Sequence, residues 1–153
     1  MKKLFLISLF VLTYSASKAQ NVYQFGFLDS TKNQVIKLNE MSNAFSQGNS
    51  KLGKIINLPN GEEKLIFYSS DLEKDEQHST TYYFNKFDKC YLCVYYSDLK
   101  DVGGSLLLLM SDNYIPLNNF TLVNKEKNIK IVYTIDLNDH NVLWKTTRFI
   151  TTR

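Results

Sequence analysis

Apolar residues occupy every second position of a segment near the C-terminus, and this alternation constrains the fold more than any other feature. Successive side chains of a β-strand point to opposite faces, so a period of two places every second residue on one face. The alternating apolar positions are Ile129, Ile131, Tyr133 and Ile135. A second strand is expected over 142–150, with the polar run 138–141 as the loop between them. The pattern predicts an antiparallel hairpin with one buried face.

The second strand of this hairpin contains Trp144, the only tryptophan of the chain. Alternation places Trp144 on the same face as Val142 and Ile150. A tryptophan in apolar company is usually buried, with its indole N–H bonded to an acceptor. We therefore expect Trp144 to lie in the core.

Further strands are expected in the first two-thirds of the chain. The dipeptide Asn60-Gly61 favours the positive φ angles of a tight turn, and it predicts a hairpin between strands 54–58 and 64–69. The remaining expected strands are 22–27, 80–85 and 90–96.

Two helices are expected. Asp29, Ser30 and Thr31 are residues that cap helices, and apolar residues follow at near-helical spacing over 30–45. The segment 98–113 is ambiguous, because its apolar stripe fits a helix whereas Gly103-Gly104 also suits a hairpin turn. The cap residue Asp98 and the terminating Pro116 favour the helix.

These elements predict an α+β fold, an antiparallel sheet of five or more strands with two helices packed on one face. The chain has 153 residues with only 6 Gly and 2 Pro, and no linker divides it. We expect a single domain over 20–153.

Residues 1–19 are typical of a secretory signal peptide. Lys2 and Lys3 precede an apolar run over 4–12, and Ser17 and Ala19 are the small residues before a cut at Gln20. No cysteine lies near the cut to accept a lipid anchor, and no later apolar run has transmembrane length. The expected location is therefore periplasmic or secreted.

Removal of this segment also changes the charge. The chain has 18 Lys and Arg against 15 Asp and Glu, and residues 1–19 contain three lysines and no acid. The remaining chain has no net charge. A nucleic-acid-binding protein needs a basic surface to neutralise phosphates, so a nucleic-acid partner is not expected.

Part of the chain resembles the SmpA/BamE-like domains, which are small exported α+β modules. The similarity covers about 25–95 and is carried by 27–32 (FLDSTK), by Val35-Ile36 and by 82–85 (YYFN). Proteins of that family act as accessory components at the bacterial outer membrane. The resemblance implies a non-enzymatic role.

The sequence provides no convincing catalytic, metal or cofactor site. Cys90 and Cys93 form a C-x-x-C motif inside an alternating run, and residues three apart on a regular strand face opposite ways. This arrangement disfavours a disulfide, a redox centre or a zinc site shared with His78 and His140. Hydrolase motifs such as G-x-S-x-G and H-E-x-x-H are absent from the sequence. We expect two separate thiols, no cofactor and no enzymatic activity.

Tyrosines provide the candidate binding residues. Tyr91 and Tyr95 share one face of the strand 90–96 by alternation, and Tyr83 on the neighbouring strand can join them. Tyrosine is favoured at protein interfaces, so this face is a candidate binding patch. The alternative is that the second helix covers it.

The sequence thus predicts a small exported protein that binds a protein partner in the cell envelope or has a structural accessory role there. An inhibitor or immunity-type protein that blocks one partner is the alternative, and a small secreted hydrolase is the third choice.

Overall fold

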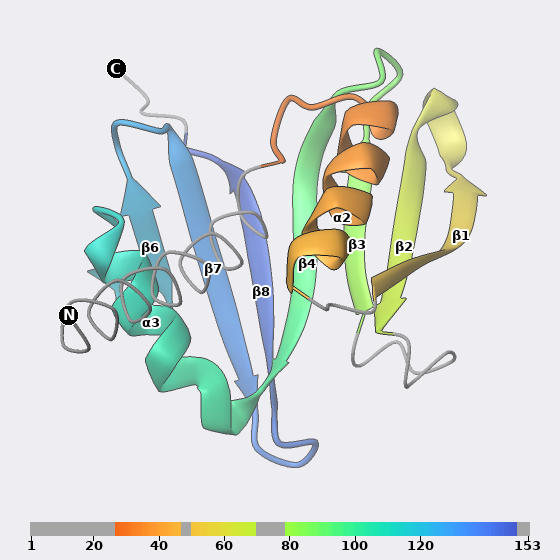
Figure 1. The fold of residues 1–153 in the computed structure, drawn as a ribbon. Coiled ribbons are helices and arrows are strands. Elements are labelled where there is room, and N and C mark those ends of the chain that lie inside the picture. The colour runs from red at the N-terminus through yellow and green to blue at the C-terminus, as the bar shows by residue number, and fades with distance from the viewer. Residues whose placement is uncertain (1–26, 47–49, 70–78, 150–153) are drawn as a thin grey trace, which may run out of the picture.

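A computed structural model describes residues 27–46, 50–69 and 79–149. Their strands form one antiparallel sheet in the order β1-β2-β3-β4-β8-β7-β6-β5 (Figure 1). The strands are β1 (Ser50–Asn57), β2 (Glu63–Ser69), β3 (Ser79–Phe84), β4 (Cys90–Asp98), β5 (Ile115–Asn118), β6 (Thr121–Asn124), β7 (Ile129–Asp136) and β8 (Asn141–Arg148). The helices are α2 (Lys32–Ser46) and α3 (Val102–Ser111), with short 3₁₀ turns at Pro59–Gly61 and Leu99–Asp101.

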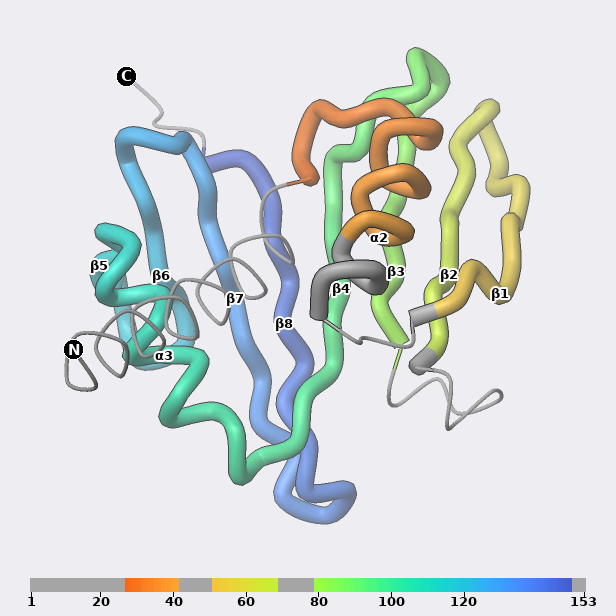
Figure 2. Tube along the Cα trace, viewed as in Figure 1, coloured from red at the N-terminus to blue at the C-terminus, as the bar shows by residue number. Residues whose placement is uncertain are grey.

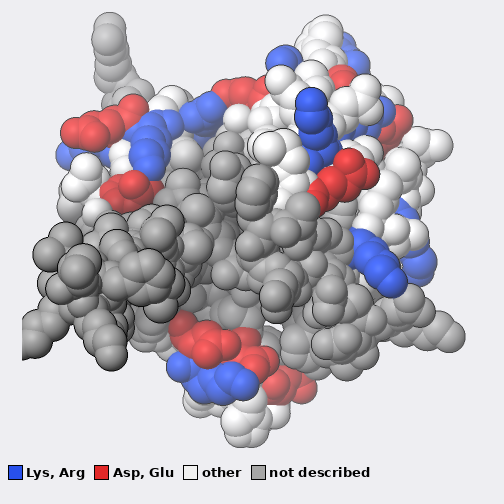
Figure 3. Space-filling model, viewed as in Figure 1, with Lys and Arg blue, Asp and Glu red and all other residues white. Residues whose placement is uncertain are grey.

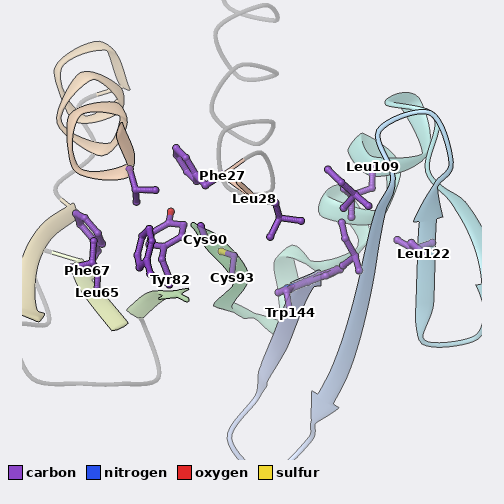
Figure 4. Packing of buried hydrophobic residues seen from close by; sticks show 14 of the residues in the cluster. Phe27, Leu28, Leu65, Phe67, Tyr82, Cys90, Cys93, Leu109, Leu122 and Trp144 are labelled. Carbon is purple, nitrogen blue, oxygen red and sulfur yellow. The ribbon is translucent and has the colours of Figure 1, made fainter. Parts of the chain in front are cut away.

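Both helices lie on the same face of the sheet, α2 near β3 and β4 and α3 near β6 and β7 (Figures 1 and 2). The buried core lies between them and the sheet (Figure 4). Its largest fully buried side chains include Trp144, Tyr82 and Phe84. The opposite face of the sheet carries neither of the two described helices.

The expected fold class is wrong. The sheet has eight strands and the two described helices have only 15 and 10 residues, so the architecture is mostly β rather than the expected α+β fold of two helices on a sheet of five or more strands. Two strands, β5 and β6, were not expected from the sequence. Each has four residues, and the proline and asparagines of β5 and its turn are typical of a loop.

Most of the other expected elements are found close to their predicted positions. The helix expected over 30–45 is α2, and Thr31 and Gln34 form a reciprocal capping box at its start. The ambiguous segment 98–113 forms a 3₁₀ turn followed by α3, so the helix is confirmed and the hairpin is not. The strand expected over 22–27 lies outside the described residues apart from Phe27, which is in no strand, and residues 1–19 also lie outside them.

The two predicted hairpins are present. Asn60 and Gly61 both have positive φ, 66° and 75°, in the turn between β1 and β2. In the C-terminal hairpin, Tyr133 pairs with Trp144. Trp144 is fully buried and donates its indole N–H to the Ser97 hydroxyl at 2.9 Å, which confirms the expected burial.

Candidate binding surface

A β-bulge in β4 determines which side chains reach each face of the sheet near the candidate patch. In the register between β3 and β4, Tyr83 pairs with Leu92 but Phe84 pairs with Cys90. Tyr91 is therefore an extra residue without a direct partner on β3. Such a bulge reverses the alternation beyond it, because one residue is added to a period of two.

The bulge changes the environment of the two cysteines. Cys90 and Cys93 pair with Phe84 and Tyr82, which lie two residues apart on β3, so both cysteines face the core. Both thiols are buried (Figure 4). The expectation that they lie on opposite faces is wrong, because it assumed a regular strand.

The same bulge brings Tyr91 beside Tyr83. Tyr83 alternates with the core residues Tyr82 and Phe84, so it lies on the face opposite the helices. The rings of Tyr83 and Tyr91 are 6.4 Å apart between centroids, with a tilt of 54°. Two of the three predicted site residues are therefore neighbours on one surface.

Tyr95 does not belong to this surface. It pairs with Thr80 on β3 and with Trp144 on β8, and it packs partly buried against the core. The predicted sharing of one face by Tyr91 and Tyr95 is wrong for the same reason as for the cysteines. Tyr95 therefore lies on the helix side of the sheet.

Glu62 completes the tyrosine pair. It directly precedes β2, and its carboxylate accepts a hydrogen bond of 3.1 Å from the Tyr91 hydroxyl. Tyr91 is 38% exposed, yet its ring is held by Tyr83 and its hydroxyl by Glu62. Partial burial and then the hydrogen bond to this carboxylate raise the pKa of Tyr91 above its ordinary value. The phenol therefore stays protonated at neutral pH.

Two further exposed residues lie in the turn that joins β3 to β4. The Phe87 side chain is 72% exposed, and the Lys86 ammonium lies 5.1 Å from the centre of its ring. Lys86 also lies near the preceding hairpin turn, because a Cβ on Gly61 would be 3.7 Å from the Cβ of Lys86. We call the group of Glu62, Tyr83, Lys86, Phe87 and Tyr91 the tyrosine patch.

Glu62, Lys86 and Phe87 were not identified from the sequence. The sequence signal that could have identified this region is Phe87. An aromatic residue between Lys86 and Asp88 in a short turn is not part of a strand whose face is buried, so it is expected to be exposed. The contact between Glu62 and Tyr91 had no such signal, since 29 positions separate the two residues.

The tyrosine patch presents aromatic rings, one cation and one carboxylate, which are groups that can contact a binding partner.

Among the described residues, no three His, Cys, Asp or Glu side chains are grouped so that they hold a metal ion. His140 lies exposed in the β7–β8 turn with its Nδ1 3.2 Å from the Asn138 carbonyl, and His78 lies outside the described residues. No helix in the described part of the chain has the length and apolar character needed to cross a membrane.

Comparison with known proteins identifies no relative of this chain: no protein-family model matches it, and no curated protein or solved structure shows significant similarity to it.

Proposed function

We propose that this protein is exported to the cell envelope and binds a protein partner there through the tyrosine patch. The observation that carries the proposal is that the exposed Tyr91 contacts the ring of Tyr83, while Phe87 is exposed in the turn that joins their two strands. Aromatic residues are enriched at the centres of protein interfaces, and a few of them usually supply most of the binding energy.

The arrangement of Tyr91 also favours binding. Its contacts with Tyr83 and Glu62 limit its rotation in the free protein. Binding then orders fewer side chains, and the entropic cost of association is smaller. An inhibitor of one partner would use the same surface as an accessory binding protein. The identity of the partner distinguishes these two roles.

A photo-crosslinking amino acid at position 87, in the protein expressed in its native host, tests this surface. We expect one envelope protein to be crosslinked from position 87. The matched control is position 137, because Leu137 is also 72% exposed but lies in the turn between β7 and β8. Equal crosslinking of the same protein from both positions would contradict the proposal.

Affinity measurements with the crosslinked protein provide the quantitative test. Phe87→Ala and Tyr91→Ala should each weaken binding by about 30-fold, which corresponds to about 2 kcal/mol for a residue at the centre of an interface. Leu137→Ala should change the dissociation constant less than twofold. Unchanged melting temperatures would show that the variants remain folded, and unchanged affinity would exclude the patch as the interface.

Export is tested separately by mass spectrometry of the protein from its native host. The Lys2-Lys3 region, the apolar run and Ser17-x-Ala19 predict an N-terminus at or near Gln20 after cleavage. A folded protein that retains Met1 would contradict this part of the proposal.

A further inference from the structure

The two edges of the sheet differ in their capacity to pair with another strand. An edge strand presents unpaired backbone N–H and C=O groups to which an extended segment can bond. β5 has four residues, contains Pro116 and loses regular register between Pro116 and Asn118. β1, at the other edge, has eight residues and no proline. Among the described strands, β1 is the one that offers a long edge.

The side chains of β1 are sorted by face. Leu52 and Ile55 pair with the core residues Phe67 and Leu65, so they lie on the helix side of the sheet. Both side chains are nevertheless exposed, Leu52 by 39% and Ile55 by 57%. β1 thus continues the apolar face of the sheet to an edge where the described residues place no further strand.

The other face of β1 carries two lysines and Ile56, which pairs with Lys64. Lys51 and Lys54 pair with Tyr68 and Ile66, on the face opposite the helices, and both lysines are exposed. β1 contains no acidic residue, and no ion pair among the described residues involves either lysine. Lys and Arg side chains (blue) are visible at the margin of the molecule where β1 lies (Figure 3).

A β-bulge interrupts β1, and the regular part of the strand follows it. The register shifts between Leu52 and Lys54, and the ring of Tyr68 occupies the space that a side chain at Gly53 would need, since a Cβ there would be 2.1 Å from the ring. Pairing continues without interruption from Lys54 to Asn57. An added strand would have its best partner along this stretch.

We propose that β1 accepts an extended segment of a partner protein as a ninth strand, and that acidic and apolar side chains alternate in this segment. Its backbone would bond to the free edge of β1, its apolar side chains would extend the row of Leu52 and Ile55, and its carboxylates would lie beside Lys51 and Lys54. Lysines on an edge also repel a second copy of the same strand, so they select a partner by charge. This proposal is independent of the tyrosine patch.

Binding of labelled eight-residue peptides to the full chain, followed by fluorescence anisotropy, tests the charge preference. A peptide of alternating Glu and Val should bind at least tenfold more tightly than one of alternating Lys and Val. The variant Lys51→Glu/Lys54→Glu should reverse this preference. The control variant Lys125→Glu/Lys145→Glu, which makes the same charge change at exposed positions outside β1, should retain it. Equal affinity for both peptides, or reversal by the control variant, would overturn the proposal.

Backbone methylation of the Glu and Val peptide tests strand addition itself. A strand that pairs with an edge uses alternate N–H groups, so methylation of one alternate set should reduce affinity at least tenfold and methylation of the other set should not. If neither methylated peptide loses affinity, the peptide does not pair with the edge and the proposal fails.

Discussion

Trp144→Ala should lower the free energy of unfolding by about 3–5 kcal/mol, the usual cost of truncating a buried tryptophan. Trp144 is fully buried and its ring lies 5.1 Å from that of Tyr133 on the neighbouring strand. A domain has about 5–15 kcal/mol of stability, so this variant should be largely unfolded or melt far below the wild type. Urea unfolding followed by circular dichroism measures the change.

Ser97→Ala is the companion variant, which removes only the hydrogen bond of Trp144. It removes the hydroxyl that accepts the indole N–H of Trp144 but leaves the ring in place, so we expect a smaller loss of about 1–3 kcal/mol. The emission of the wild-type protein should be blue-shifted and poorly quenched by iodide, since Trp144 is the only tryptophan. A Trp144→Ala variant within 1 kcal/mol of the wild type would contradict the buried position.

The protein should also lose stability steeply above about pH 9, because two thiols are buried in the core. Burial raises the pKa of Cys90 to about 12 and raises that of Cys93 well above its ordinary value. The folded state therefore retains protons that the unfolded chain releases. Stability is complete below the ordinary thiol pKa and declines as pH rises, by up to about 1.4 kcal/mol per pH unit for each thiol.

Urea unfolding in the presence of reductant, at pH values from about 8 to 11, measures this decline. In the variant Cys90→Ala/Cys93→Ala the decline should begin about one pH unit higher, where tyrosines ionise. Burial raises the pKa of Tyr82 as well, so a residual decline remains in the variant. The prediction fails if wild type and variant have the same slope between about pH 9 and 10.

The tyrosine patch shows how far the sequence predicted the candidate site. The sequence predicts Tyr83 and Tyr91 as site residues because they are aromatic and lie on neighbouring strands, and the structure places their rings side by side. Regular alternation predicts the wrong face for Tyr95, because the added residue in β4 reverses the alternation. Glu62 was missed because its contact with Tyr91 depends on how β2, β3 and β4 are arranged side by side.

The sequence by itself determined three kinds of feature: the strands that are long enough to show alternating apolar residues, the turn at Asn60-Gly61 and the burial of Trp144. These features depend on local backbone preference and on the removal of apolar side chains from water. Both effects are determined by residues that are close together in the sequence. Only the tertiary structure decided that eight strands join one sheet, that β5 pairs with β6 and β6 with β7, and that Cys90 faces the core beside Cys93. The physical reason is that hydrogen bonds between strands determine the register and the bulges. A local sequence pattern therefore does not predict which residue of a strand has no partner on the next strand.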